Sequence, residues 1–211
     1  PPSGTGPLVV RGVGVVGLSL GLLGCGESTP PPRRTLDIQT ASFDVPAGEE
    51  RYLCWTETLT EDIVVDRFDY AARPVIHHLL VSRSLIPVED GLAECDVLFR
   101  PTWAPLFIAG SGDAALEAPP GAGYHLPAGT QLVTQLHLLN TTSATVSDAA
   151  TVTMREHEPG EDERIGIFSF GTTDIDIPSN ATSQVENDCI VDKGVEIFAW
   201  LARMHYLGSS I

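Results

Sequence analysis

The chain has 211 residues and a formal net charge of −16 at pH 7, from 28 acidic and 12 basic side chains. This acidic balance argues against nucleic-acid binding and against docking on anionic lipid, because both partners repel a negative surface. Hydrophobic residues make up 43% of the chain, enough for a packed core, and the 16 prolines and 20 glycines favour a loop-rich β protein, since both residues interrupt helices.

The N-terminal residues have the pattern of a bacterial export signal. Arg11 precedes an apolar run over residues 12–23, whose length suits a signal-peptide core and is too short to cross a bilayer comfortably. The run ends in Leu22-Leu23-Gly24-Cys25, which resembles the lipobox of bacterial lipoproteins, where the cysteine becomes the lipidated first residue. The alternatives are an ordinary signal peptide and a buried hydrophobic strand.

The lipoprotein interpretation divides the chain into four parts. We expect a signal peptide over 1–24, a tether over 25–35, a first domain over 36–157 and the beginning of a second domain over 158–211. A charged run containing proline and glycine marks the internal boundary. The protein is then exported and held on the periplasmic or cell-surface side of the envelope by a lipid at Cys25, in a compartment where disulfides persist.

From Leu36 onward, short apolar runs alternate with turn residues, a pattern typical of an all-β sandwich or barrel. In several runs the apolar residues fall at every second position, as at Phe43 and Val45, and no segment has a long helical period. Pro46-Ala47-Gly48 and Pro127-Ala128-Gly129 are turn signals. Strands are predicted over residues 38–45, 63–69, 75–82, 131–139, 150–156, 165–170 and 195–202.

Three histidines lie inside strongly apolar strand sequences: His77 and His78 side by side, and His137 in a second strand. An unsatisfied buried polar group costs about 1–3 kcal/mol, so these imidazoles need partners, and three on two strands could bind one metal. Adjacent strand residues point to opposite faces, so His77 and His78 can share a metal only through local twisting or through different ring nitrogens. An all-imidazole donor set suits copper or zinc. The alternative is one core histidine bonded to a carbonyl and two histidines facing solvent.

Two further histidines are weaker candidates. His125 lies at the beginning of a predicted strand and is expected to be structural. His157 lies in the acidic run and is expected to be solvated. The sequence has no glycine-rich phosphate loop and no serine nucleophile in an elbow motif.

Several motifs occur in a distinctive order. Tyr52-Leu53-Cys54 precedes the His77-His78 pair, Gln135-Leu136-His137 follows the pair, and Arg203-Met204-His205 comes near the end of the chain. In this order and spacing the chain resembles the copper type II, ascorbate-dependent monooxygenases, which include peptidylglycine α-hydroxylating monooxygenase and dopamine β-monooxygenase. The resemblance extends over roughly residues 36–208.

The resemblance implies two jelly-roll β-sandwich domains, each holding one copper ion, separated by a water-filled cleft. His77, His78 and His137 match the three ligands of the first copper, which stores and delivers an electron. His205 matches one ligand of the second copper, where dioxygen binds and the substrate C–H bond is broken. The family also uses ascorbate or a similar reductant as co-substrate. The sequence does not identify the peptide or small molecule that would be the substrate of this chain.

The resemblance further implies a disulfide between Cys54 and Cys95, and it matches Cys189 to a cysteine whose usual partner comes later than the end of this chain. At the second copper the family has a His-x-His pair, where this chain has Arg203 and His205. Arg203 cannot replace an imidazole ligand, because its guanidinium stays protonated. Met204 is not at the position of the family's third ligand, a methionine well downstream. Two explanations of these departures stay open. The chain is either a fragment of a longer protein, which the missing initiator methionine favours, or a diverged, inactive relative.

Three functions are therefore weighed. The first is a copper monooxygenase that hydroxylates a C–H bond with dioxygen and an ascorbate-like reductant. The second is a non-catalytic copper-binding lipoprotein that keeps only the first site. The third is a zinc hydrolase with three histidine ligands, against which no carboxylate near these strands stands out as a general base.

Overall fold

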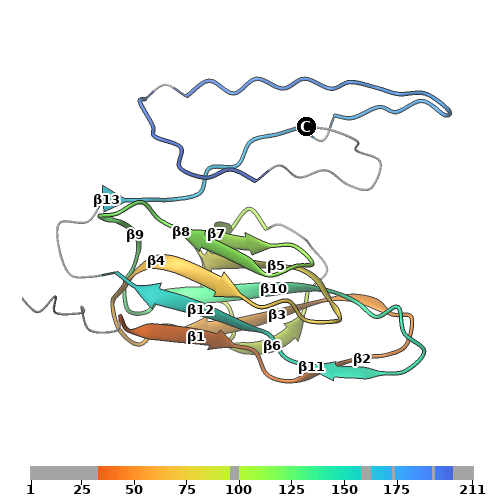
Figure 1. Cartoon of the computed structure of the whole chain (residues 1–211), viewed down its shortest axis with the longest axis horizontal. Coiled ribbons are helices and arrows are strands. Elements are labelled where there is room, and N and C mark those ends of the chain that lie inside the picture. The colour runs from red at the N-terminus through yellow and green to blue at the C-terminus, as the bar shows by residue number, and fades with distance from the viewer. Residues whose placement is uncertain (1–32, 96–99, 158–162, 173, 192, 202–211) are drawn as a thin grey trace, which may run out of the picture. The chain divides into compact units, whose positions relative to one another are not determined.

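β-strands form the folded part of the chain in the computed structural model (Figure 1). The structure describes residues 33–95, 100–157, 163–172, 174–191 and 193–201, and no helix forms within these ranges. The strands are β1 (Thr35–Gln39), β2 (Phe43–Val45), β3 (Glu50–Thr58), β4 (Ile63–Tyr70), β5 (Ile76–Ser84), β6 (Gly91–Glu94), β7 (Trp103–Ala109), β8 (Ala114–Glu117), β9 (Ala122–Leu126), β10 (Gln131–Leu139), β11 (Val146–Asp148), β12 (Thr151–Glu156) and β13 (Glu163–Arg164).

Most of these strands belong to two sheets. In the described part of the chain, one sheet has the order β1-β12-β4-β9-β13, with β8 also paired to β4, and the other has the order β6-β3-β10-β5-β7. β2 and β11 form a separate pair. All pairings are antiparallel except that of β13 with β9. β10 is the central strand of its sheet, so its side chains lie between those of β3 and β5.

The two larger sheets pack against each other around an apolar core. Phe68 of β4 stacks on Phe107 of β7 with ring centroids 5.4 Å apart, so this contact crosses from one sheet to the other. Leu79 of β5 and Leu136 of β10 are fully buried in the same core. Alternate residues of each strand face this core, as two stacked sheets require. The all-β sandwich expected from the sequence is confirmed.

Four of the predicted strands are confirmed to within two residues at either end, namely those over 63–69, 75–82, 131–139 and 150–156. The strand predicted over 38–45 is instead divided, because β1 pairs with β12 whereas β2 pairs with β11. Thr40 lies between the two: its N–H donates to the carbonyl of Ala150 and its Oγ1 accepts the Ala150 N–H, both at 3.0 Å. The pairing with β12 ends at these bonds, and the residues that follow form β2 and pair with β11.

Both Pro-Ala-Gly sequences form the predicted turns. The Glu49 N–H donates to the Pro46 carbonyl at 3.2 Å, and the Thr130 N–H donates to the Pro127 carbonyl at 3.0 Å. Gly48 and Gly129 have φ angles of 72° and 82°, which a type II turn requires at its third residue and which glycine adopts without a Cβ clash. The two turns lead into β3 and β10.

The strands predicted over 165–170 and 195–202 are wrong for the residues that the structure describes. β13 pairs with β9 only at Glu163 and Arg164, and residues 165–170 and 195–201 form no strand. A strand is stable only beside a hydrogen-bonded neighbour, and this segment has no such neighbour in the described part of the chain after the bond from the Ile165 N–H to Gly123. Ile165 and Ile167 still pack against the core as partly buried side chains, whereas Phe168, Phe170, Val195 and Ile197 are exposed; in Figure 1 the segment runs as coil beyond β13.

The predicted signal peptide and the lipid-anchor residue Cys25 lie outside the described residues. Among the described residues, no helix has the length and apolar character needed to cross a membrane.

Candidate metal centre

Three imidazoles meet where the end of β10 pairs with the beginning of β5. His78 Nδ1 lies 3.2 Å from His77 Nδ1 and 3.2 Å from His137 Nδ1. One ligand atom from each of the three residues lies within 4.8 Å of the other two. The three histidines singled out from the sequence therefore form one cluster in space.

A β-bulge brings the two adjacent histidines to the same place. His137 is paired with His78, whereas the next residue of β10, Leu138, is paired with Ile76, so His77 is the extra residue of β5. A bulge places two residues of one strand opposite one residue of its neighbour and changes the direction of a side chain. The bulge is the local twisting expected as one of the two ways in which His77 and His78 could share a metal. Different ring nitrogens are not needed, because the closest contacts use Nδ1 of all three rings.

The Nδ1 separations fit a single metal ion. An imidazole nitrogen binds zinc at about 2.0–2.1 Å, so two nitrogens on one tetrahedral or trigonal ion lie about 3.3–3.6 Å apart. The observed contacts of 3.2 Å are close to this range. Hydrogen bonds alone do not satisfy all three Nδ1 atoms. A neutral imidazole carries one N–H, whereas His78 Nδ1 faces two other Nδ1 atoms. A metal cation would accept all three lone pairs.

The cluster is open to solvent on one side. His137 is buried, His78 is half-buried and His77 is exposed. His137 is therefore the inner residue of the cluster and His77 the accessible outer one. An ion or a small molecule can approach from the side of His77.

Two residues of β3 hold the ring of His137. Glu50 Oε1 lies 2.6 Å from His137 Nε2, on the side of the ring away from the cluster. Tyr52, the partner of His137 across the β3–β10 pair, stacks on its ring with centroids 4.4 Å apart and an interplanar angle of 6°. Sequence reasoning assigned no role to Glu50. The available signal was its spacing of two from Tyr52, which puts both side chains on one face of a strand.

The predicted disulfide is present. Cys54 and Cys95 are bonded, with Cα atoms 5.8 Å apart, and so connect β3 to the residue that follows β6. Cys54 is paired with Gln135, two residues before His137 on β10, and the Gln135 amide donates to Cys95 Sγ at 3.9 Å. The disulfide therefore stabilises the strand that carries Glu50 and Tyr52. Cys189 is exposed and forms no disulfide with another described cysteine.

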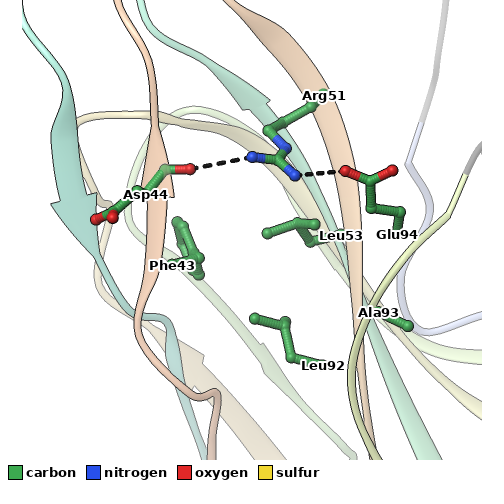
Figure 2. Close-up of a pocket in the computed structure, with 7 residues that line it drawn as sticks. All are labelled: Phe43, Asp44, Arg51, Leu53, Leu92, Ala93 and Glu94. Carbon is green, nitrogen blue, oxygen red and sulfur yellow. Dashed lines mark hydrogen bonds and ion pairs between the residues drawn. The ribbon is translucent and has the colours of Figure 1, made fainter.

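Arg51 of β3 borders a shallow hollow on the same strand. Its guanidinium donates to Glu94 at 2.5 Å and to the Asp44 carbonyl at 3.2 Å. Figure 2 shows the guanidinium between these two groups, above the side chains of Phe43 and Leu53. The hollow has a volume of about 320 Å³. An adjoining hollow is lined by Arg51, Tyr52, Glu94 and Cys95. Tyr52 therefore lies between His137 and an open surface.

Among the described residues, the other histidines named from the sequence, His125 and His157, do not belong to the cluster. His205, proposed for a second copper, lies outside the described residues together with Arg203. His125 of β9 lies in the other sheet, and its buried Nε2 has no hydrogen-bond partner in the described ranges. His157 was expected to be solvated, and this is wrong: its Nδ1 lies 3.3 Å from the buried carboxylate of Asp66, because β12 runs beside β4.

No protein-family model matches the chain, and no curated protein is significantly similar to it.

Proposed function

We propose that this chain binds one copper ion through Nδ1 of His77, His78 and His137. We further propose that the ion is the electron-transfer centre of a monooxygenase that hydroxylates a C–H bond with dioxygen and an ascorbate-like reductant. The observation that carries the proposal is that His78 Nδ1 lies 3.2 Å from Nδ1 of both His77 and His137, at a β-bulge. The reaction itself comes from the sequence resemblance.

The donor set favours copper. Three neutral imidazoles suit copper and zinc, and for a given site of nitrogen donors copper binds more tightly than zinc. A zinc hydrolase with three histidine ligands would also need a general base beside the open position of the metal. Glu50 contacts Nε2 of His137, not the Nδ1 side that faces the cluster, so this carboxylate supports a ligand and is not placed as a base.

The surroundings of the cluster suit electron transfer. When bound, copper changes between its two oxidation states and supplies one electron at a time. His137 is held by a hydrogen-bonded carboxylate on one edge and an aromatic ring on one face, so its position can stay the same in both states. His77 is exposed, which gives a soluble reductant access to the cluster.

A non-catalytic copper-binding lipoprotein is the second candidate. It is favoured by Arg203, which stands where the family has a histidine of the second copper and which cannot coordinate a metal. Both candidates share the first copper site, an exported location and a lipid anchor at Cys25. They differ in whether His205 belongs to a working second centre.

Metal analysis of the purified protein and three variants tests the proposal. We expect about one tightly bound copper per cluster in the parent protein, and its loss in His77→Ala and in His137→Ala. His125→Ala is the matched control, because it removes an imidazole from the other sheet and should keep copper. Circular dichroism must show that each variant is folded. Zinc in place of copper would favour the hydrolase, and a folded parent protein that binds neither metal would refute the site.

Turnover separates the two copper proposals. A monooxygenase should consume dioxygen in the presence of copper, ascorbate and a suitable C–H substrate, and His77→Ala should abolish this consumption. A copper-loaded protein that is reduced by ascorbate but hydroxylates none of a panel of peptides and amines would favour the non-catalytic candidate.

A further inference from the structure

We infer that Glu50 is the positioning residue of the metal centre: it fixes which nitrogen of His137 is the metal donor and sets the balance between the two oxidation states of the bound copper. This inference rests on the copper site proposed above. It assigns a role to a carboxylate that does not itself face the metal position.

The contact between Glu50 and His137 determines the form of the ring. An ionised carboxylate can only accept hydrogen bonds, so at 2.6 Å the hydrogen of the ring must be on Nε2. A neutral imidazole has one N–H, and Nδ1 is then left with a free lone pair directed at His78 Nδ1. Glu50 therefore selects the tautomer in which His137 is ready to bind a metal through Nδ1.

The backbone holds Glu50 in this position although its side chain is 59% exposed. The type II turn at Pro46 ends at Glu49, whose carbonyl accepts the N–H of Asn140 at 2.9 Å. The N–H of Gly48 donates to the Asn140 carbonyl, also at 2.9 Å. The two residues before β3 are thus bonded to the residue after β10, and Glu50 is opposite Leu139, so the carboxylate starts from a fixed Cα two residues from Tyr52.

The charge of Glu50 acts on the metal through the ring. A carboxylate on the outer nitrogen makes the inner nitrogen a stronger donor, and its negative charge stabilises a doubly charged ion more than a singly charged one. Removal of the charge should therefore weaken Cu(II) binding more than Cu(I) binding. The loss of such a supporting group typically lowers metal affinity about 10–100-fold. If the loss for Cu(II) exceeds that for Cu(I) ten-fold, the reduction potential rises by about 59 mV, the value for a one-electron couple.

The test compares Glu50→Gln with Glu49→Gln in the full chain. Both variants remove one negative charge, and Glu49 is the residue just before Glu50 but contacts the cluster through no side-chain bond that the structure describes. Dissociation constants for Cu(II) and Cu(I) are measured by competition with chelators, and the potential and the Cu(II) electron paramagnetic resonance spectrum are recorded. We expect weaker Cu(II) binding, a higher potential and a changed spectrum for Glu50→Gln only.

The outcomes distinguish this inference from the proposal on which it rests. If the parent protein binds copper and loses it in His137→Ala, but both glutamine variants behave alike, the role of Glu50 is refuted and the copper site stands. Equal losses of Cu(II) and Cu(I) affinity with an unchanged potential would also refute it, since they would mean that Glu50 only supports the fold. A parent protein without copper affinity would refute both.

Discussion

Replacing Tyr52 by leucine should weaken copper binding by a limited and calculable amount. Tyr52 lies flat on the ring of His137, with centroids 4.4 Å apart. An aromatic pair of this kind contributes about 0.5–1.5 kcal/mol beyond the area that it buries. Because the stacking holds His137 in the orientation that directs Nδ1 to the cluster, its loss increases the population of other ring orientations by at most about 2- to 13-fold.

The apparent copper affinity falls in proportion to the fraction of molecules with the ring in the binding orientation. Tyr52→Leu should therefore bind Cu(I) and Cu(II) more weakly by no more than about 13-fold, and by the same factor for both ions. Competition titration with a chelator measures this. Tyr52→Phe keeps the stacked ring and is the control.

Two results would contradict this reasoning. An unchanged affinity in Tyr52→Leu would show that Glu50 and the backbone orient His137 without the ring of Tyr52. A loss of several hundred-fold would show that the substitution disrupts β3 itself, which far-ultraviolet circular dichroism and the midpoint of thermal unfolding would reveal.

Two further expectations concern stability. Removing the disulfide in a Cys54→Ala, Cys95→Ala double variant opens a loop of 41 residues and should lower the free energy of unfolding by about 4 kcal/mol, measured by urea denaturation under oxidising conditions. Hydrogen bonds from Arg67 lower the pKa of Asp69 below its ordinary value of 3.8. That pairing stabilises the fold above the ordinary pKa and is lost as pH falls through the lower, folded value. Asp69→Asn should therefore destabilise the protein by less than about 1 kcal/mol at pH 7, and by a smaller amount at pH 2.

A smaller disulfide effect would mean that the unfolded chain is already compact without the bond. An Asp69→Asn variant that is equally destabilised at both pH values would show that packing, and not charge, is what this carboxylate contributes.

The predicted strands that the structure confirms, β4, β5, β10 and β12, each have a paired neighbour on both edges, but β3 and β9 also have two neighbours and were not predicted. β10 is the clearest case, since its nine residues agree with the prediction at both ends. β7 was not predicted, because Pro105 lies inside it; a proline is tolerated there because β7 is at the edge of its sheet. The segment after β13 has the same alternation as a strand, but alternation does not reveal whether a partner strand is present.

The amino-acid sequence by itself determined the class of the fold and the chemistry of the candidate site. Alternating apolar residues and frequent turn residues favour a β-sandwich or barrel, and imidazoles within apolar strands need either hydrogen-bond partners or a shared metal ion. Only the tertiary structure decided how those nitrogens meet. The bulge at His77 depends on the pairing between β5 and β10, and the contact of Glu50 with His137 depends on the register of β3. Register and bulges are set by contacts between strands that are distant in sequence, so no local pattern contains them.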